Sequence, residues 1–371
     1  MLGALTIQRL LQKMQEVKAS DLHIKVGSPP VMRVNGHLQQ IKSEPLNAND
    51  TAQLLNPIVP AHLVNDLNEQ GGIDFSYHED IEHRYRCSVF HAGHSLHAAI
   101  RRVNPQIPGF DDLHLPPIYK KLAHDTHEGL ICVCGVTGSG KSSTLAAMVD
   151  HINAHEHMNI ITVEDPIEYL LRPKMSFISQ REVGIDVKTF QGALRSAVRQ
   201  DPDVIMIGEM RDRETMMAGL QAAETGHLVF VTLHTADAMQ SFARILEFFP
   251  SHEHTFIRSS LANGLQAVCA QRLLPSCRPG IGVVPATEVL LNTPIVQDRI
   301  REGGDEDIPA ILHGSAAEGM HDFTASLTRL VEEDWVDLKT AERFAPNREA
   351  LLSKVRGIQV KGDSLIQRIK G

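Results

Sequence analysis

Aromatic residues are scarce in this chain of 371 residues, because Phe, Trp and Tyr together make up only 5% of it. Its cores must therefore be aliphatic, and no aromatic platform for stacking nucleic-acid bases stands out. The five cysteines are an odd number and scattered, so no disulfide framework is predicted. No apolar run reaches the length needed to span a membrane. A reducing cytoplasm is the simplest compartment for such a chain.

Basic residues are also too few for a protein whose main partner is nucleic acid. Lys and Arg number 36 against 45 Asp and Glu, which gives a formal net charge of −9, and no long Lys/Arg run occurs. Affinity that comes mainly from neutralising phosphates needs the opposite balance. We therefore expect no nucleic-acid partner, although the balance leaves room for a local basic patch.

The length is enough for two or three domains, and 42% apolar residues can supply their cores. Residues 1–103 predict a small α+β domain, with a helix over about residues 5–17 ahead of its strands. Asn35 and Gly36, between two strand-like runs, predict a type I′ hairpin. The predicted strands are 21–26, 31–34, 37–41, 73–77, 84–90 and 96–103.

Residues 104–118 predict a linker, because four prolines and Gly109 break regular structure there. Proline restricts the backbone, so the linker can act as a hinge with few preferred states. From residue 119 to 371, predicted strands alternate with helices as in a mostly parallel sheet, and a mostly helical tail begins at about residue 293. The predicted strands are 130–134, 160–163, 204–207, 227–233 and 283–290, and the predicted helices are 142–153, 189–199, 213–224 and 238–248.

A glycine-rich run joins the strand predicted at 130–134 to a helix-forming stretch. Strand, loop and helix together fit a phosphate-binding loop, in which backbone N–H groups turn inward around the phosphates of a nucleotide. Lys141 can reach the outer phosphates, the Ser142 hydroxyl can bind Mg²⁺, and the helix dipole adds to the attraction. The sequence therefore predicts binding of ATP or GTP. The predicted nucleotide-binding residues are Gly135, Thr137, Gly138, Ser139, Gly140, Lys141, Ser142 and Ser143.

Glu209 follows the apolar strand predicted at 204–207, which places it beside the phosphate loop at the carboxyl edge of the sheet. In many phosphate-loop enzymes this strand ends in an aspartate that helps to hold Mg²⁺, but here Gly208 takes that position. A glutamate at 209 suits orienting or deprotonating the attacking water, or holding Mg²⁺ through water. The alternative is a solvated acid at a strand end.

Glu164 follows a second apolar strand, predicted at 160–163. Several acids near an anionic ligand are unfavourable unless a cation lies between them, which favours a Mg²⁺-binding or water-activating role for Glu164. A capped turn is an equally good interpretation, because Asp165 and Pro166 form a turn dipeptide.

His234, Arg86 and Arg101 complete the candidates. His234 lies at the carboxyl end of a predicted strand, where it can sense the terminal phosphate, although a single histidine there is more often structural. Arg86 and Arg101 lie on the last strands of the first domain. A correctly placed arginine raises phosphoryl-transfer rates roughly a thousandfold or more, but the residues alone favour the polar face of a strand.

Taken together, these motifs resemble the type II/IV secretion and pilus-motor ATPases, and among them the PilT-like pilus retraction ATPases. The resemblance covers nearly the whole chain and includes the elements called the Asp box, Walker B and the His box in this family. Besides the phosphate loop, the matching segments are residues 20–24, 27–30, 33–36, 164–168, 180–184, 201–203, 207–212, 225–227 and 232–235.

The resemblance implies an α/β protein with a PAS-like N-terminal domain, a hinge and a RecA-like ATPase domain. It implies a homohexameric ring that binds ATP and Mg²⁺ and converts hydrolysis into domain rotation. It assigns Glu209 as the catalytic glutamate, Glu164 as a second catalytic acid and His234 as a phosphate sensor. Arg86 and Arg101 match arginines that reach the nucleotide in such motors. For both residues the resemblance therefore favours a role at the nucleotide over a place on the polar face of a strand.

The implied function is ATP-driven pilus retraction, or twitching motility, at the cytoplasmic face of the inner membrane. The implied partners are an inner-membrane platform protein and a related accessory ATPase, with peripheral membrane association only. Pilus-extension and type II secretion ATPases usually carry a further N-terminal domain and a Cys-x-x-Cys zinc element; neither is found here, which favours the retraction branch.

One segment departs from the retraction pattern. Retraction ATPases usually carry Ala-Ile-Arg-Asn-Leu-Ile-Arg-Glu in the C-terminal region, and residues 295–302 keep only its ending well. A PilU-like accessory motor and a secretion-system ATPase therefore stay as alternatives. A RecA-like DNA motor is less favoured by the acidic balance, and a nucleotide-gated assembly protein without turnover is less favoured by Glu209 and Glu164.

Overall fold

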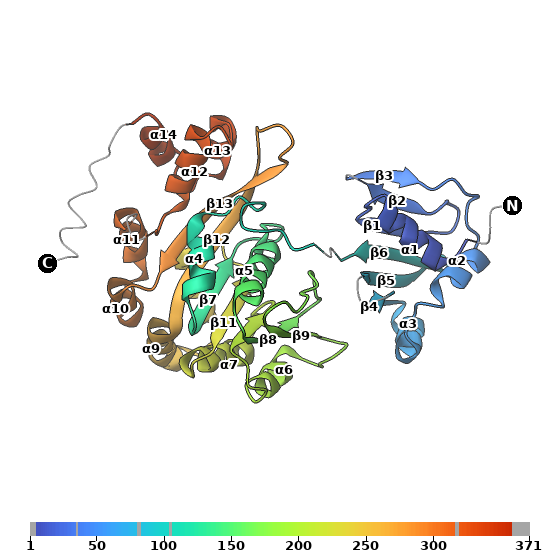
Figure 1. Ribbon diagram of the computed structural model, residues 1–371, viewed down its shortest axis with the longest axis horizontal. Coiled ribbons are helices and arrows are strands. Elements are labelled where there is room, and N and C mark those ends of the chain that lie inside the picture. Colours follow the sequence, from blue (N-terminus) through green and yellow to red (C-terminus); the bar gives the residue numbers. More distant parts are fainter. Residues whose placement is uncertain (1–4, 35, 80–82, 104–105, 316–318, 358–371) are drawn as a thin grey trace. The chain divides into compact units, whose positions relative to one another are not determined.

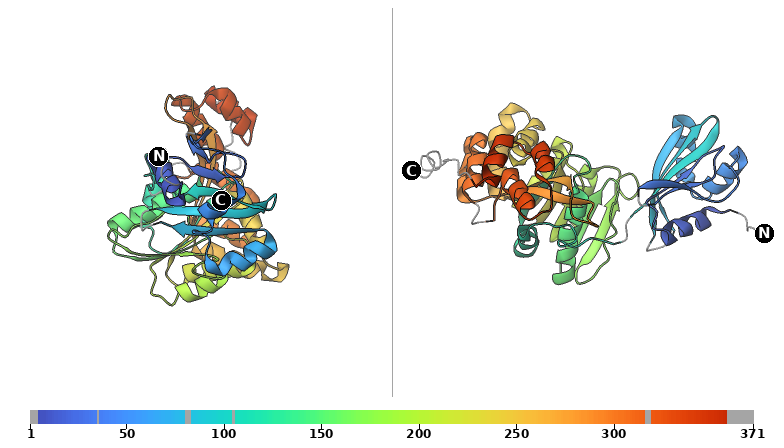
Figure 2. Two further views of the ribbon diagram at one scale, coloured as in Figure 1. Left: turned by 90° about the vertical axis from the view of Figure 1, so that its right-hand side faces the viewer. Right: turned by 90° about the horizontal axis from the view of Figure 1, so that it is seen from above.

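The structure is a computed structural model that describes residues 5–34, 36–79, 83–103, 106–315 and 319–357 (Figures 1 and 2). The chain forms two compact units: Met1–Gln106 with Pro166–Leu170, and Ile107–Asp165 with Leu171–Gly371. Residues 104 and 105 of the predicted linker, and Asn35 of the predicted hairpin turn, lie outside the described residues. Among the described residues, no helix is long and apolar enough to cross a membrane.

The first unit is an antiparallel sheet flanked by helices, as expected for the PAS-like α+β domain. Its strands run in the order β3-β2-β1-β6-β5-β4, and every neighbouring pair is antiparallel. Its elements are α1 (Ile7–Glu16), β1 (Asp21–Ile24), β2 (Val31–Val34), β3 (His37–Gln40), α2 (Ala48–Leu55), η1 (Ala61–Leu63), α3 (Val64–Gln70), β4 (Gly72–His78), β5 (Arg84–Ala92) and β6 (Ser95–Arg102).

Helix α1 shows how the sequence builds this unit. The Thr6 side chain accepts a hydrogen bond from the Arg9 backbone N–H at 3.4 Å and so caps the helix. Apolar residues at helical spacing then form one buried face against the sheet: Ile7, Leu10, Leu11 and Met14.

The second unit is a seven-stranded sheet in the order β13-β12-β7-β11-β10-β8-β9. All neighbouring pairs are parallel except β12 and β13, which confirms the predicted mostly parallel RecA-like sheet. Its elements up to the last strand are α4 (Pro117–Asp125), β7 (Gly129–Cys134), α5 (Lys141–His155), β8 (Asn159–Glu164), β9 (Phe177–Glu182), α6 (Phe190–Ala197), β10 (Val204–Ile207), α7 (Arg213–Glu224), β11 (Leu228–Leu233), α8 (Ala238–Glu247), η2 (Ser251–Glu253), α9 (His254–Gly264), β12 (Leu265–Pro275) and β13 (Val283–Leu291).

Five of these elements were not predicted, namely α4, η2, α9, β9 and β12. The edge strand β9 has few apolar residues, because most of its side chains are only half-buried. Strand β12 begins directly after α9, and Asn263 and Gly264 at the end of α9 form a turn dipeptide that could have marked the change from helix to strand. Helix α4 starts at Pro117, inside the predicted linker.

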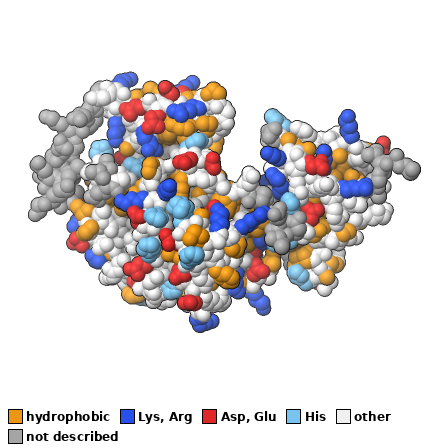
Figure 3. All heavy atoms as spheres, viewed as in Figure 1, with side chains coloured by type: hydrophobic (Ala, Val, Ile, Leu, Met, Phe, Trp, Pro, Cys, Tyr) orange, Lys and Arg blue, Asp and Glu red, His pale blue; other side chains and the backbone are white. Residues whose placement is uncertain are grey.

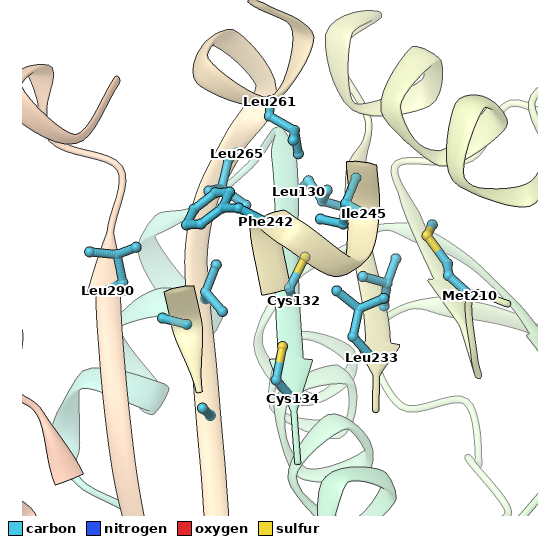
Figure 4. Packing of buried hydrophobic residues seen from close by; sticks show 14 of the residues in the cluster. Leu130, Cys132, Cys134, Met210, Leu233, Phe242, Ile245, Leu261, Leu265 and Leu290 are labelled. Carbon is cyan, nitrogen blue, oxygen red and sulfur yellow. The ribbon is translucent and has the colours of Figure 1, made fainter. Parts of the chain in front are cut away.

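The core of the second unit lies on both faces of this sheet. Figure 4 shows Cys132 and Cys134 of β7 among apolar side chains that include Phe242 and Ile245 of α8. Burial raises the pKa of the Cys134 thiol to about 11 and that of Cys132 well above its usual value. Both cysteines are therefore packing residues.

The predicted helical tail follows β13. Helix α12 packs on β13 and α13 on β12, at one end of the sheet order, where Figures 1 and 2 show the C-terminal helices gathered beside these two strands. The tail consists of α10 (Pro294–Glu302), η3 (Asp305–Asp307), α11 (Ile308–Gly314), α12 (Phe323–Glu332), α13 (Leu338–Phe344) and α14 (Arg348–Val355).

Candidate nucleotide-binding site

The predicted phosphate loop connects β7 to α5 at the carboxyl edge of the sheet. Gly140 has a φ of +89° and is followed by Lys141, the first residue of α5. A Cβ atom on Gly135 would lie against Ser139 Oγ and 2.6 Å from the Gln271 carbonyl oxygen. Only glycine fits there, so the loop can fold tightly against β12.

The Lys141 ammonium group lies inside the loop. Its Nζ donates hydrogen bonds to the carbonyl oxygens of Gly135, at 2.7 Å, and Val136, at 3.2 Å. Lys141 is buried, and Ser142 and Ser143 on the same helix turn are half-buried. A phosphate group entering the loop would meet a poorly hydrated positive charge, which strengthens its binding.

Gln271 of β12 is a site residue that sequence reasoning missed. Its Nε2 donates to the Ser139 carbonyl oxygen at 2.7 Å, and its Oε1 accepts from the Thr144 hydroxyl at 2.9 Å. Gln271 is almost fully buried, so both bonds are shielded from water. The side chain thus ties the loop to the first turn of α5.

Glu209 and His234 are brought together after the strands that precede them. His234 Nε2 lies 3.3 Å from Glu209 Oε1. Arg211 forms a forked ion pair with the same carboxylate, at 2.6 Å from Nε to Oε1 and 2.7 Å from Nη2 to Oε2. The Glu209 side chain remains 22% exposed, so water can reach it.

The charges around Glu209 keep it ionised. Burial by itself raises the pKa of this carboxyl group, but the hydrogen bond from Arg211 and the nearby charges of His234, Arg211 and Lys141 outweigh burial. The pKa of Glu209 is therefore below its ordinary value. An ionised carboxylate facing water at the edge of a phosphate site can accept a hydrogen bond or a proton from that water.

Gly208 explains why the usual aspartate is missing before Glu209. A Cβ atom at this position would lie 3.2 Å from Glu164 Cα and 3.4 Å from the Val163 carbonyl oxygen, so the strand ends approach closely. The Gly208 N–H donates to the same Val163 oxygen at 2.8 Å, and the Thr232 hydroxyl donates to the Gly208 carbonyl oxygen.

Glu164 is the last residue of β8 and is buried. Its Oε1 accepts hydrogen bonds from the Thr162 hydroxyl at 2.8 Å and from Gln180 Nε2 at 3.0 Å. Gln180 is itself held by the Leu171 backbone N–H, which donates to its Oε1 at 2.8 Å. The carboxylate is thus fixed by neutral donors from β8 and β9.

The sheet register brings these groups to one edge. Ile207 of β10 pairs with Val163 of β8 and with Val231 of β11, and Leu233 of β11 pairs with Cys134 of β7. Glu164, Glu209, His234 and the phosphate loop therefore leave the sheet at the same carboxyl edge, where ligands of such sheets bind.

The oxygen donors at this edge suit Mg²⁺. Within the described parts of the chain, no group of three or more His, Cys, Asp and Glu could hold a metal ion by itself. Ser142 and the carboxylates of Glu209 and Glu164 offer the hard oxygen ligands that Mg²⁺ prefers, and phosphate oxygens and water complete its shell in such sites.

Arg86 and Arg101 belong to the first unit, where they face each other across β5 and β6. Both are exposed. Arg101 also pairs in register with Asp21 of β1, and its Nε lies 2.8 Å from Asp21 Oδ1. Burial raises the pKa of Asp21, but the hydrogen bonds from Arg101 and Ser20 bring it below its ordinary value. The Arg101 side chain is thus held by a charged partner on the same sheet.

A parallel sheet with a phosphate loop and two acids at its carboxyl edge defines the class of phosphate-loop nucleotide-binding proteins. The family described as "Type II/IV secretion system protein" matches residues 4–302. This chain belongs to that family, which confirms the predicted resemblance and the predicted enzyme class, a phosphate-loop ATP hydrolase.

Similar proteins agree with this membership. The type IV pilus retraction ATPase PilT of Pseudomonas aeruginosa is 37% identical over 91% of this chain and 98% of its own length. The type IV pilus ATPase PilU of the same organism is 36% identical over 98% of this chain and 95% of its own. A crystal structure of the pilus retraction motor PilT with bound ADP matches with a TM-score of 0.87 and 39% identity, over 94% of this chain and 99% of that one.

Proposed function

We propose that this protein is an ATPase motor that hydrolyses ATP to drive retraction of a type IV pilus. The observation that carries the proposal is the Glu209–His234 pair, 3.3 Å apart, beside the phosphate loop. Such a pair offers a general base for water and a group that contacts the terminal phosphate. The likeness to PilT, a pilus retraction ATPase, supports the same conclusion.

Each residue of the site has a place in this reaction. The loop N–H groups, Lys141 and the helix dipole hold the phosphates. Ser142 directly, and Glu209 through water, would hold Mg²⁺, which neutralises developing phosphate charge when bound. Glu209 orients the attacking water and accepts its proton, and His234 contacts the terminal phosphate.

The remaining candidates support the same step. The fixed carboxylate of Glu164 acts as a second catalytic acid. The family resemblance assigns Arg86 and Arg101 to stabilising the charge of the transferred phosphate, which is the usual task of arginine in phosphoryl transfer. In this assignment, Asp21 competes with phosphate for Arg101.

The assembly follows from the same resemblance. We assign a homohexameric ring at the cytoplasmic face of the inner membrane, associated only peripherally, with a platform protein as partner and a related ATPase as accessory. A closed ring lets each subunit use the same contact surfaces. Figure 3 shows acidic and basic side chains interspersed on the viewed face of the second unit, which fits a protein partner better than nucleic acid.

A PilU-like accessory motor is the second candidate. The departure at residues 295–302 favours it, whereas the 36% identity to PilU fits it no better than the 37% identity to PilT fits a retraction motor. The two candidates differ in one measurement: a retraction motor restores twitching to cells that lack their own retraction ATPase, whereas an accessory motor does not.

The decisive experiment deletes the native gene in the source organism and restores it either as the wild-type gene or as the Lys141→Ala variant. We expect wild type to support pilus retraction and Lys141→Ala to lose both nucleotide affinity and twitching, because the ammonium contacts phosphate in the ground and transition states. Mass determination in ATP and in ADP should show a hexamer in at least one state. Normal twitching with Lys141→Ala would refute the proposed motor.

A further inference from the structure

Glu288 is a buried carboxyl group that has no part in the proposed reaction. It lies on β13, and only 8% of the residue is exposed. Its Oε1 accepts a hydrogen bond at 2.9 Å from the backbone N–H of Ala238, the first residue of α8. The backbone N–H of Phe323, the first residue of α12, faces the same carboxyl group. Glu288 therefore lies where two helices begin, and the N–H groups at a helix start attract an acid.

Both helices have a cap of their own besides Glu288. Asp237 accepts a hydrogen bond from the Gln240 N–H at 2.8 Å at the start of α8. Asp322 accepts one from the Ala325 N–H at 2.6 Å at the start of α12. Such caps already stabilise the first turn of each helix. Glu288 is thus not needed to begin either helix, and its contact with the first residue of both helices joins them instead.

The first turn of α8 connects Glu288 to the phosphate edge of the sheet. The Ser241 hydroxyl in this turn lies 2.7 Å from the Thr235 hydroxyl and 3.2 Å from Cys134 Sγ. Thr235 directly follows His234, and Cys134 ends β7 immediately before the phosphate loop. Ser241, Thr235 and Cys134 are all buried, so these contacts are shielded from water. A displacement of the start of α8 would therefore displace His234.

Arg272 of β12 contacts the same two helix starts. Its Nη2 donates to the Ala236 carbonyl oxygen at 3.3 Å, just before α8, and its guanidinium carbon lies 4.1 Å from the ring centroid of Phe323. Its Nη1 donates to the Phe344 carbonyl oxygen at 2.8 Å, at the end of α13. We call the contacts of Glu288 and Arg272 with the starts of α8 and α12 the helix junction. The helix junction attaches the helical tail to the segment that follows β11.

We propose that Glu288 is a positioning residue for ATP hydrolysis: by accepting the Ala238 N–H it fixes the start of α8 in the helix junction, and through Ser241 it sets the position of His234. The proposal rests on the proposed function of the phosphate loop. Its consequence is that a change in the packing of the tail reaches His234 without altering the groups that bind the phosphates.

The protonation of Glu288 changes near neutral pH. Burial raises the pKa of Glu288 to about 7, with Asp237 and Asp322 adding to the effect and the Ala238 and Phe323 N–H groups opposing it. The folded protein therefore holds a proton on Glu288 more tightly than the unfolded chain does. A protonated carboxyl group keeps a carbonyl oxygen that can accept from Ala238, whereas ionisation works against the buried position. The helix junction is therefore less stable above neutral pH than below it. Further charged or titratable groups at this junction are Arg272 on β12, His313, which lies 3.5 Å from Asp322, and His321, which hydrogen-bonds Thr287 next to Glu288.

The main test compares Glu288→Leu with Glu288→Gln in the full-length protein, by steady-state hydrolysis of ATP and by ADP binding. Leucine has no acceptor for the Ala238 N–H, so kcat should fall about tenfold because His234 is misplaced. KM and ADP affinity should stay at wild-type values, because Lys141 and the phosphate loop are unchanged. Glutamine keeps an acceptor oxygen and should restore kcat to within about twofold of wild type. Glu214→Leu, at an exposed position on α7, is the matched control and should change nothing.

The same measurements can overturn the positioning role. Wild-type kcat in Glu288→Leu would do so, as would an equal loss of kcat in Glu288→Gln. A loss of ADP affinity as large as the loss of kcat would show damage to the whole site, and not misplacement of His234. Lys141→Ala separates this inference from the proposed function, since normal hydrolysis by Lys141→Ala would refute the function itself. An inactive Lys141→Ala beside a fully active Glu288→Leu would refute the positioning role alone.

Ser241→Ala tests the path through α8. It removes the hydroxyl that contacts Thr235 and Cys134 and leaves Glu288 in place. The value of kcat should fall about as far as in Glu288→Leu, and the double variant should be no slower than the slower single variant, because both changes break one path. Losses that multiply in the double variant would show that Glu288 does not act through Ser241.

Hydrogen exchange on the wild-type protein needs no variant, so no folding defect can disturb it. After correction for the intrinsic effect of pH on exchange, the amides of α8 and α12 should be less protected at pH 8 than at pH 6, because Glu288 is ionised at the higher pH. The amides of α1, in the first unit, are the control and should show no such difference. Equal protection of α8 and α12 at the two pH values would contradict a helix junction that depends on Glu288.

Discussion

Glu209 and Glu164 lie at the carboxyl ends of neighbouring strands of one sheet, but their carboxyl groups are held in different ways. Glu209 is held by charged groups, because Arg211 forms an ion pair with both of its carboxylate oxygens and His234 lies beside one of them. Glu164 is held by a hydroxyl and an amide, and it is buried. The position of a carboxylate held by ion pairs changes with salt, with pH and with the binding of a phosphate. Hydrogen bonds from neutral donors in a buried site instead hold a carboxylate in one geometry.

This contrast assigns different tasks to the two acids. Arg211 is 68% exposed, so its ion pair with Glu209 can exchange for water or nucleotide at little energetic cost. Glu209 is therefore free to meet the attacking water. Glu164 keeps its position because Gln180 is itself held by the Leu171 N–H. We infer that Glu209 acts on the water directly and that Glu164 provides a fixed negative charge beside it.

The largest effect is expected from Glu209→Gln. The amide cannot accept the proton of the attacking water, so turnover should fall by about a hundredfold to ten-thousandfold. ATP affinity should persist, because Lys141 and the loop are unchanged. Steady-state hydrolysis and equilibrium binding measure the two effects, and Glu214→Gln, an exposed acid on α7, is the control. Near-normal turnover would move the catalytic role to Glu164.

Glu164→Gln should reduce turnover less, by about tenfold, but should also destabilise the fold. The glutamine amide oxygen can still accept from Thr162 and Gln180, but the negative charge that strengthens both hydrogen bonds is lost. The expected loss in free energy of unfolding is about 1–3 kcal/mol. Chemical denaturation and hydrolysis rates check both parts. The comparison between the two acids would be wrong if Glu209→Gln lowered the free energy of unfolding and Glu164→Gln did not.

Arg211→Ala sharpens the contrast through pH. Burial raises the pKa of Glu209, but the hydrogen bond and charges around it outweigh burial and lower the pKa. The carboxylate therefore stays ionised to a lower pH than usual, and it becomes protonated as the pH falls through the lowered pKa. Removing Arg211 raises this pKa, so the acid limb of the rate profile should move to higher pH. High salt should shift it the same way. Arg213→Ala, whose partner is Glu253, should leave the limb in place.

The parts of this site that sequence patterns predict are those encoded within a few residues. The phosphate loop is one contiguous run, and Glu209 and His234 each lie within two residues of the end of an apolar strand whose parallel neighbours end at the same edge. The predicted catalytic and binding roles of these residues remain predictions, because no ligand contact tests them.

Sequence patterns could not predict the parts of the site that depend on tertiary contacts between residues far apart in the chain. Gln271 lies 132 residues from the Ser139 carbonyl that it binds, and Arg272 lies 72 residues from that of Phe344. Both belong to β12, which was not predicted although the turn dipeptide Asn263-Gly264 stands directly before it. The replacement of the usual aspartate by Gly208 is visible in the sequence, but its cause, the close approach of Glu164, is visible only in the fold.

The smallest effect is expected from Thr162→Val, which tests whether the hydroxyl positions Glu164. Thr162 is fully buried and valine has almost the same shape, so packing is kept while the hydroxyl donor to Glu164 Oε1 is lost. The free energy of unfolding should fall by about 1 kcal/mol and turnover by only about twofold to threefold. Thr162→Ser keeps the hydroxyl but loses a methyl group, so it should lose comparable stability without losing turnover. If both variants hydrolyse ATP at the wild-type rate, the Thr162 hydroxyl is not needed to fix the carboxylate. If Thr162→Val is as slow as Glu164→Gln, the hydroxyl acts on the reaction itself, and the view of Glu164 as a group held by neutral neighbours must give way to one in which Thr162 takes part.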